Sequence, residues 1–521
     1  MRQLSFISRL KSLAVVFGMA LAFSSCANED VPQNPTKSNE DNDKNLTTFM
    51  AGGETRTSLN YDSGDFYWED GDYIYVKDDD GVLRKSTNAP THKVASFRYR
   101  VPGKFTANTS YKVYYFGKNS SNNQVVIPSA QSQSTPNNTE HFDVSGDYGT
   151  ATATGTLGGG SFSFELEHQA TYLVFLPYTN NTILKNCYLT KVEVNSDNDI
   201  AETYTFNPTT GALDASAGTG SKQIVLTTSG SGSYSNGFPL TNSSASVTTN
   251  GAYMVIKPGT HTLKIRYWVK DLVSNVEGTI TRTLSSETYK PNTYYDMTAN
   301  LDARNYDGNH YYMWDAQEHY WKGFEWTKHL SGNTGQPTLY GNSSSNIPQS
   351  NTDPRWHNES FPGQGIINSA LHSCKDLPNV NEMTWYAVAG DPRWDADEVW
   401  TTMGHLHKSG MWFKKKSQIS GFNANTAYDG TDWRTTNTNY QAPPPSNTPP
   451  SAADANNYFY LPSLGQYNSG TLYSIDYGAI YWLSSAAPRY SNTAYALWIG
   501  AGTVKVIFTY RYGCFCVGTF E

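Results

Sequence analysis

The chain has 521 residues, a length that allows several domains of typical size. Its formal net charge of −8 argues against binding to nucleic acid, and five cysteines are too few for a fold that rests on disulfide bonds. Aromatic residues reach 14%, with 37 Tyr and 42 Gly, which is typical of an exported all-β protein with many tight turns.

The N-terminal segment predicts export and a lipid anchor. Basic residues within positions 2–11 precede an apolar run over residues 13–23, which is shorter than the roughly 20 residues of a membrane-spanning helix. The run ends in Phe-Ser-Ser-Cys, and the small residues directly before Cys26 resemble a bacterial lipobox. We expect residues 1–25 to be removed as a signal peptide and Cys26 to carry a lipid that holds the chain in the outer membrane. An ordinary signal peptide with a chance cysteine is the alternative.

Residues 26–45 are predicted to form a flexible tether. The acidic stretch at residues 27–30 resembles the surface-export signal of Bacteroidetes lipoproteins. Residues 31–45 are mostly polar and cannot bury a core. The mature protein is therefore expected at the cell surface.

Residues 46–300 carry many short runs in which polar and apolar side chains alternate, the pattern of half-buried β-strands. Within residues 72–77, Ile74 and Val76 face one way and the residues between them face the other. Residues 171–176 form a more continuously apolar strand-like run.

A glycine run at residues 155–160 interrupts the strand pattern and is interpreted as a domain boundary. The region up to residue 301 is long enough for two β-sandwiches built from such short strands. We therefore predict the first sandwich over residues 46–158 and the second over residues 159–301.

Residues 302–521 differ in composition and predict a third domain of the α+β class. Pro, Trp and His become more frequent, and residues 441–450 form a Pro-rich segment that is expected to be a stiff exposed loop. One helix is predicted near residues 378–387, where Asn379 or Asn381 can cap the first turn.

Two motifs resemble the opening of Bacteroidetes fimbrillin-family proteins. Thr-Arg-Thr stands at residues 55–57, and Trp-Glu-Asp-Gly-Asp at residues 68–72 follows directly before a predicted strand. Residues 204–211 are similar to a common hairpin of the same family. The resemblance covers about residues 46–300 and implies two tandem transthyretin-like β-sandwich domains. It also implies a role in the type V pilus, whose subunits join by strand complementation.

Arg56 is the candidate processing site. It lies between two strand-like segments, residues 46–51 and 57–59. Cleavage there would release the lipid-bearing end and open a groove that accepts a strand of another subunit. An ordinary role for Arg56 as a strand residue is the alternative.

The C-terminal region resembles a different family, the FISUMP (Fibrobacter succinogenes major paralogous) domains. Leu-Pro followed by Glu at residues 377–382, Tyr-Trp-Leu-Ser-Ser at residues 481–485 and Tyr-Gly at residues 512–513 are similar to landmarks of that family, in order. This resemblance implies a C-type-lectin-like fold. The calcium-dependent sugar motifs of true C-type lectins are absent from the sequence, so any sugar binding is expected to be independent of that calcium.

The late cysteines leave the question of a disulfide bond open. The resembled family pairs a late cysteine with the one before Leu-Pro, which is Cys374 here, but Cys514-Phe-Cys516 replaces the usual sequence. Two cysteines at i and i+2 in a strand point to one face, so only one of them can pair easily. A bond from Cys374 to Cys514 or Cys516 is possible, and free thiols are the alternative.

The motifs of known catalytic and metal sites are missing from the sequence. Residues 78–81, Asp-Asp-Asp-Gly, lack the further ligands of an EF-hand loop and are interpreted as a polar hairpin turn. His405 and His407 would share one face of a strand, but a zinc site needs at least a third protein ligand. His372 and Asp395 are the possible third ligands, and neither lies at a fixed spacing typical of a zinc motif. Hydrolase, zinc-protease and P-loop motifs are absent, so we expect neither an enzyme nor a cofactor.

Aromatic side chains of the third domain are the candidates for partner binding. Their rings can stack on sugars, and neighbouring Asn and Asp side chains can bind hydroxyl groups. A place in the domain core is the alternative for any single Trp. The candidates are Trp356, Trp394, Trp400, Trp412, Trp433, Asn358, Asp391 and Asp395.

These features favour a structural or adhesive surface protein, namely a subunit at the pilus tip whose third domain contacts a glycan or host partner. In the resembled family, stalk subunits donate C-terminal strands, and a folded domain stands in that place here. The first alternative is a lipid-anchored glycan-binding protein that does not polymerise. The second is a cell-surface hydrolase with an unrecognised site, for which a polysaccharide hydrolysis screen is the test.

Overall fold

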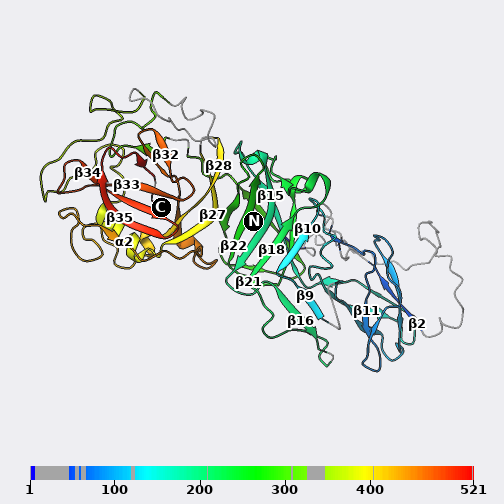
Figure 1. Cartoon of the computed structure of the whole chain (residues 1–521). Coiled ribbons are helices and arrows are strands. Elements are labelled where there is room, and N and C mark those ends of the chain that lie inside the picture. The colour runs from blue at the N-terminus through cyan, green and yellow to red at the C-terminus, as the bar shows by residue number, and fades with distance from the viewer. Residues whose placement is uncertain are drawn as a thin grey trace, which may run out of the picture.

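The prediction of a mainly β chain is confirmed, and Figure 1 shows strand-rich modules in a row, from β2 and β11 at one end to β33–β35 at the other. The described part of the chain holds two α-helices, α1 (Val247–Asn250) and α2 (Val380–Ala389). Neither is long and apolar enough to cross a membrane. The computed structural model describes residues 2–5, 46–52, 58–59, 61, 66–118, 124–207, 209–306, 309–324, 346–402, 404–518 and 520.

The first module is one sheet that curls around a small core. Its main strand order is β6-β5-β8-β11-β12-β2-β7, and β13 (Glu167–His168) pairs with β11 beside this path. Phe49 and Trp68 are among the side chains buried inside it. The Thr87 N–H donates to the Arg100 carbonyl oxygen over 2.7 Å, so the two ends of the sheet approach each other. The strands are β2 (Leu46–Ala51), β5 (Tyr75–Lys77), β6 (Leu83–Lys85), β7 (Phe97–Pro102), β8 (Ser110–Tyr115), β11 (Gly149–Gly155) and β12 (Ser161–Phe164).

The alternation predicted for residues 72–77 is confirmed, because Ile74 and Val76 are fully buried while the residues that follow each of them are partly exposed. The polar turn predicted at residues 78–81 is also confirmed. It joins β5 to β6, and the Asp78 carboxylate accepts backbone N–H groups of its own turn.

The second module is a sandwich of two sheets around a larger core. One sheet has the order β1-β25-β14-β20, and the other begins β10-β18-β15-β22-β23. All residues of β14 except the last are buried, which fits its continuous apolar sequence. The strands are β1 (Arg2–Ser5), β10 (Ala130–Gln133), β14 (Thr171–Tyr178), β15 (Cys187–Ser196), β18 (Gln223–Thr228), β20 (Ala252–Ile256), β22 (Leu263–Asp271), β23 (Glu277–Thr283) and β25 (Thr293–Asn300).

The glycine run at residues 155–160 is not a domain boundary, contrary to the prediction. It forms the turn of the β11–β12 hairpin inside the first module, and Gly158 has a φ of +69°, which suits a turn glycine. In addition, β9 (Gln124–Ile127) and β10, both expected in the first sandwich, pair with β16 (Glu202–Phe206) and β18. The chain therefore enters the second module with β9, returns to the first for β11 to β13, and re-enters the second with β14.

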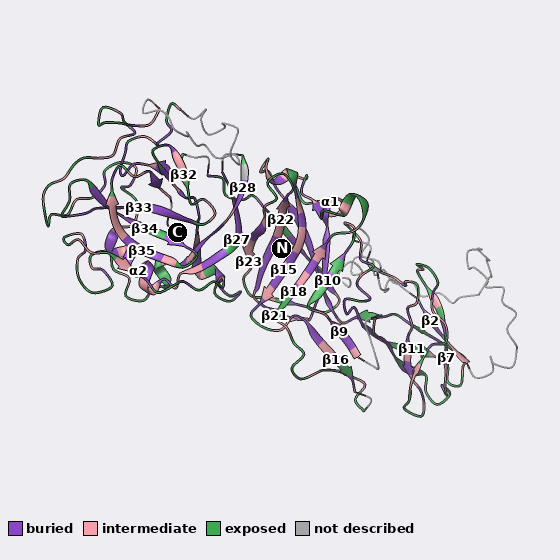
Figure 2. Ribbon diagram, in the orientation of Figure 1, coloured by how far each residue is buried: buried purple, intermediate pink, exposed green. Residues whose placement is uncertain are grey.

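The third module combines a six-stranded sheet with α2. The strand order is β26-β36-β33-β34-β35-β29, and α2 packs against β33, β34 and β35. Every residue of β33 is buried, with Trp482 on one face and Tyr481 on the other, and Figure 2 shows this strand in purple. The strands are β26 (Tyr311–Tyr312), β29 (Tyr440–Gln441), β33 (Gly478–Ala486), β34 (Thr493–Gly500), β35 (Thr503–Tyr510) and β36 (Phe515–Cys516).

One sheet runs from the second module into the third. Thr279 of β23 pairs with Glu398 of β27 in parallel, so that the strand order continues β23-β27-β28-β30. β27 has an irregularity between Asp395 and Val399, directly at this contact. The added strands are β27 (Arg393–Thr402), β28 (His405–Lys414) and β30 (Tyr458–Pro462).

Short strands complete the described fold. Most of them pair in small separate sheets, and β19 pairs with β15 of the large sheet. They are β3 (Ser58–Leu59), β4 (Phe66–Tyr67), β17 (Leu213–Ala215), β19 (Phe238–Pro239), β21 (Gly259–His261), β24 (Glu287–Tyr289), β31 (Gln466–Asn468) and β32 (Thr471–Tyr473).

The predicted helix of the third module is confirmed as α2, and Asn379 rather than Asn381 is its N-cap. The Asn379 side chain accepts the Glu382 N–H over 3.0 Å, and the Glu382 carboxylate accepts the Asn379 N–H over 2.8 Å. This reciprocal pair is a capping box, which satisfies two N–H groups at the start of the helix. Asn381 is buried and donates instead to Asp432.

Replacing Asn379 by Ala is expected to lower the free energy of unfolding by about 1 kcal/mol, because the first turn of α2 loses its side-chain acceptor. Urea unfolding of the full chain measures the change. Asn379→Asp is the control, since it keeps the acceptor for the Glu382 N–H and loses only the amide hydrogen bond to the Ala424 carbonyl oxygen, so it should be more stable than the Ala variant. Equal stability of the Ala and Asp variants would contradict the assigned cap.

Candidate functional site

β2 lies inside the sheet of the first module rather than at its edge. It pairs with β12 in parallel, from Thr48 opposite Ser161 to Ala51 opposite Phe164. On its other side it pairs with β7 in antiparallel register along its whole length. Removal of β2 would therefore expose two strand edges that face each other across a gap one strand wide.

Phe49 anchors β2 in the core of the first module. Its side chain is fully buried. Its ring stacks on Phe162 with 5.3 Å between the ring centroids and meets Phe105 edge-on at 5.1 Å. A strand that replaces β2 must therefore supply a large apolar side chain at this position.

Strands occupy both sides of the candidate processing site, as predicted. β2 has the predicted bounds, Leu46–Ala51, and β3 follows in a short hairpin with β4. Arg56 and Cys26 themselves lie outside the described residues. Processing at Arg56 and lipidation of Cys26 therefore stay predictions.

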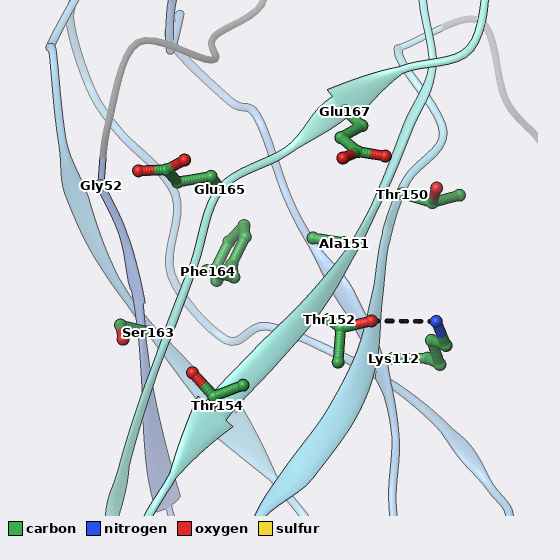
Figure 3. A pocket seen from close by; sticks show the side chains of 10 residues that line it. All are labelled: Gly52, Lys112, Thr150, Ala151, Thr152, Thr154, Ser163, Phe164, Glu165 and Glu167. Atoms are coloured by element: carbon green, nitrogen blue, oxygen red, sulfur yellow. Dashed lines mark hydrogen bonds between the residues drawn. The ribbon is translucent and has the colours of Figure 1, made fainter. Parts of the chain in front are cut away.

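A pocket of about 560 Å³ opens beside the end of β2, next to Gly52 (Figure 3). It lies between β11 and the segment from β12 to β13. β11 pairs with β12 at Thr154 and with β13 at Thr150, and the hairpin is splayed between these two points. The pocket thus lies where β11 is not paired with the segment from β12 to β13, next to the end of β2.

Most side chains around this pocket are polar and exposed, and the buried Ala151 and Phe164 complete the lining. Figure 3 shows Glu165 and Glu167 around one end, whereas Lys112 donates to the Thr152 hydroxyl oxygen over 2.9 Å at the other. Both glutamates and the lysine are exposed. This geometry suits contact with an approaching chain segment better than enclosure of a small molecule.

The predicted tryptophans do not line one exposed groove. Trp394, Trp400 and Trp433 are buried, with 6%, 1% and 5% of their surface exposed, which corrects the expectation of an open binding surface at these positions. Large aromatic side chains bury a large surface area when they pack in a core, and these three pack in the main core cluster of the third module.

The remaining candidates are partly exposed or engaged in hydrogen bonds. The Trp356 indole N–H donates to Glu359 over 2.9 Å, and the Asn358 amide donates to the buried Asp315 over 2.7 Å. Asp391 forms an ion pair with Arg393 at 2.9 Å. These contacts position loops of the third module, and partner binding by these residues stays a prediction.

The bond considered between Cys374 and Cys516 is not formed, because both residues and Cys514 are free thiols. Cys514 and Cys516 pack in the same core cluster, as their i, i+2 spacing predicted. Phe515, between them, points the other way and packs in the cluster that contains Cys374. The thiols therefore lie on opposite sides of the sheet, where no bond can join them.

His407 is held by an aromatic ring and a carboxylate. Its ring stacks on Trp400 with 4.9 Å between the centroids, and its Nδ1 lies 3.0 Å from an oxygen of Asp476. Within the described ranges, no group of three or more His, Cys, Asp or Glu side chains is arranged so that it could hold a metal ion.

A buried charged cluster joins the second module to the third. The Arg266 guanidinium donates to Asp395 over 2.9 Å and to the Thr279 hydroxyl oxygen over 2.7 Å. The two charged side chains are only 9% and 1% exposed. The Trp412 indole N–H donates to the other Asp395 oxygen over 3.1 Å. Two of the predicted partner-binding residues, Trp412 and Asp395, thus hold the junction together.

Glu398 belongs to the same junction. Its carboxyl oxygens accept the Thr281 N–H over 2.9 Å and the Thr279 hydroxyl over 3.1 Å. Burial, which disfavours the charged carboxylate, and the nearby negative charge of Asp395 raise the pKa of Glu398 to about 7. Glu398 therefore keeps its proton to a higher pH than an exposed glutamate does.

The raised pKa of Glu398 predicts a pH-dependent stability. The native chain binds more protons than the unfolded chain between the ordinary Glu value of 4.5 and about 7, so the free energy of unfolding should fall as the pH rises through this window. One pKa unit corresponds to about 1.4 kcal/mol. Urea unfolding at about pH 5 and pH 8 measures the difference. The Glu398→Gln variant should show a smaller difference, and an unchanged one would contradict the assignment.

The sequence analysis missed a pair of exposed tyrosines at the end of β35. Tyr510 and Tyr512 are each 51% exposed, and their rings stack at 5.0 Å with an angle of 14° between the planes. Arg511, between them, is fully buried and donates to the carbonyl oxygens of Asn358 and Ser360. Their i, i+2 spacing in a predicted strand was the signal that could have placed both rings on one face.

Comparison with known proteins yields structural neighbours. A scan against models of known protein families finds no match, and a search of curated proteins finds no relative. Among solved structures, a candidate cell adhesion protein from Bacteroides ovatus ATCC 8483 is 13% identical. Its TM-score is 0.31, over 49% of this chain and 93% of that one.

Two further neighbours carry fimbrial descriptions. The fimbrial anchor protein Mfa2 from Porphyromonas gingivalis is 10% identical, with a TM-score of 0.22 over 46% of this chain and 82% of that one. A fimbrial protein from Bacteroides ovatus ATCC 8483 is 10% identical, with a TM-score of 0.22 over 90% of this chain and 98% of that one.

Proposed function

We propose that this chain is a structural and adhesive subunit of a cell-surface pilus, assembled by strand complementation. The observation that carries the proposal is the position of β2, a strand held between β12 and β7 by two ladders. β2 comes first in the predicted mature domains, and Arg56 follows it. Cleavage after Arg56 frees β2, and the vacated groove accepts a strand of a neighbouring subunit.

The sequence motifs support the same role. The Thr-Arg-Thr and Trp-x-x-Gly-Asp elements resemble the fimbrillin family, whose domains are transthyretin-like sandwiches. Trp68 of this motif is buried against Tyr99 and Tyr115, so the motif belongs to the module that would accept the strand. The proposed role requires neither catalysis nor a cofactor.

We place the subunit at the pilus tip, with residues 302–521 as the part that contacts a glycan or host partner. This region directly follows β25, where subunits of the resembled family carry their donor strands. The lectin-like fold implied by the FISUMP resemblance belongs to the same proposal. Before processing, the lipid on Cys26 holds the precursor in the outer membrane.

The second candidate is a lipid-anchored glycan-binding protein that does not polymerise. The stacked pair of Tyr510 and Tyr512 favours it, since exposed and rigidly held rings suit contact with sugars. In this case β2 stays in its sheet and Cys26 keeps its lipid.

N-terminal sequencing of surface-extracted protein, together with metabolic lipid labelling, separates the two candidates. The pilus proposal expects chains that begin at Thr57 in sheared surface material and a lipid on Cys26 of the membrane-bound precursor. Surface chains that begin only at Cys26 would favour the anchored protein. Absence of acyl mass on Cys26 would refute the lipid anchor in both.

A further inference from the structure

β2 points alternate side chains into the core of the first module. Phe49 and Ala51 are 0% and 2% exposed, whereas Thr48 and Met50, which alternate with them, are partly exposed. Two successive inward positions of one strand therefore hold a very large and a very small side chain. The side chains that surround each position explain this order.

The position of Phe49 is wide and lined by large rings. In the strand pairing Phe49 lies opposite Tyr99 of β7 and Phe162 of β12. Its ring meets Phe105 and Tyr111 edge-on, with 5.1 and 6.4 Å between the centroids. Tyr111 also packs on Phe105 and on Phe162, so these rings hold one another in place. A small side chain at this position would therefore leave a cavity that the rings cannot close.

The position of Ala51 is narrow. In the strand pairing Ala51 lies opposite Phe97 of β7 and Phe164 of β12, so a large aromatic residue stands on each side of it. Trp68 is buried in the same core cluster, and its ring meets the Phe164 ring edge-on with 6.4 Å between the centroids. A large side chain in place of Ala51 would have to displace one of these rings, which costs packing energy.

Trp68 keeps this position narrow when β2 is absent. Its ring meets Tyr99 and Tyr115 edge-on, at 5.4 and 5.7 Å between the centroids. None of these three residues belongs to β2, so their contacts persist after β2 leaves. The vacated groove therefore keeps one wide and one narrow position in a fixed order.

We propose that the groove selects its incoming strand by the pattern aromatic, any residue, small residue. The aromatic side chain takes the position of Phe49, and Ala, Gly or Ser takes that of Ala51. Backbone hydrogen bonds to β7 and β12 hold any extended segment, so the two inward positions supply the specificity. The partner is thus a chain segment that carries this pattern and runs parallel to β12. The inference deepens strand complementation, proposed above, and rests on it.

Peptides with the sequence of residues 45–52 test the selection when they compete with a labelled wild-type peptide for the chain that begins at Thr57. The Phe49→Ala peptide should bind at least about a hundredfold more weakly, because it leaves the wide position empty. The Ala51→Leu peptide should bind at least about tenfold more weakly, because it overfills the narrow one. Met50→Gln changes a partly exposed side chain and is the matched control, which should bind within about threefold of the wild type.

The Ala51→Leu peptide separates selection from general hydrophobic binding, since a groove without a narrow position would bind the more apolar peptide more tightly. Equal or tighter binding of this peptide would overturn the proposal, and so would unchanged binding of the Phe49→Ala peptide. Strand complementation itself would stand in both cases, because the wild-type peptide still binds. Failure of the wild-type peptide to bind would overturn both proposals.

The intact chain provides a second measurement that needs no peptide. Ala51→Leu should lower the midpoint of urea unfolding although it adds apolar surface, and Trp68→Phe should lower it by leaving a cavity. The two losses should not add in the double variant, because the Leu side chain fills space that the smaller ring leaves. Additive losses would show that Trp68 does not limit the position of Ala51 and would overturn its assigned role.

Discussion

A chain that begins at Thr57 is expected to lose the stable fold of its first module, and a peptide with the sequence of residues 45–52 is expected to restore it. The truncation removes the buried Phe49 and both ladders of β2. Loss of one buried Phe side chain alone costs about 3–5 kcal/mol. A domain is typically stable by only about 5–15 kcal/mol, so little stability remains without the strand.

Hydrogen exchange of the truncated chain, with and without the peptide, measures this effect in β7 and β12. The peptide should restore the protection of both strands at once, because it bonds to each of them. A peptide that carries Phe49→Asp is the control and should fail, since it would bury a charge against Phe162. Native protection of β7 in the truncated chain without any peptide would show that β2 is not an essential part of the sheet.

Replacing Arg266 by Met is expected to destabilise the junction of the second and third modules by about 3–5 kcal/mol. The ion pair with Asp395 is buried, and the variant leaves that carboxylate without its cation. Trp412 still donates one hydrogen bond to Asp395, but a neutral donor does not balance a buried charge. Urea unfolding, followed by tryptophan fluorescence, measures the loss.

The double variant Arg266→Met with Asp395→Asn separates the charge from the packing. Asn keeps an acceptor for Trp412 and removes the negative charge, so the double variant should recover most of the lost stability. Additive losses in the two single variants would show that the pair contributes through packing alone. A double variant no more stable than Arg266→Met would place the effect in the turn that Asp395 caps, where it accepts the N–H groups of Asp397 and Glu398.

Local features of the fold could be predicted from the sequence because their causes are local. Residues 46–51 were predicted as a strand, the period-two pattern located the inner face of β5, and the two candidate caps Asn379 and Asn381 marked the start of α2. The turn at residues 78–81 follows from Asp and Gly preferences alone. In each case the side chains that decide the structure lie within a few residues of one another.

The domain boundary and the partner-binding residues could not be predicted, because they depend on distant pairings. A glycine run marks a hairpin turn and a linker equally well, and only the pairing of β9 with β16 shows which applies. Likewise, Trp394 and Trp400 carry no local sign that they face a core rather than solvent. Some of their contacts come from distant segments: the Trp400 ring meets the Tyr306 ring edge-on, and the Trp394 N–H donates to the Ser446 carbonyl oxygen.

The cysteines illustrate the same limit within one strand. Their spacing correctly placed Cys514 and Cys516 on one face. It contained no information on the layer that holds Cys374, which depends on how Trp314, Ala370 and Cys374 pack against β33. The alternation of side chains along a strand therefore determines which residues share a face. Which other segment packs against that face depends on the tertiary fold.

The place of β2 inside its sheet also determines how the protein withstands mechanical tension. Tension applied through the segment before residue 46 acts along the axis of β2, parallel to both of its ladders. The hydrogen bonds to β7 and β12 are then loaded in shear and have to rupture together rather than one after another. The contact of β23 with β27 has a single paired position, Thr279 with Glu398. Under a pull between the two ends of the molecule, this junction therefore depends on its buried side chains, such as Arg266 and Asp395, whereas the β2 groove depends on backbone hydrogen bonds.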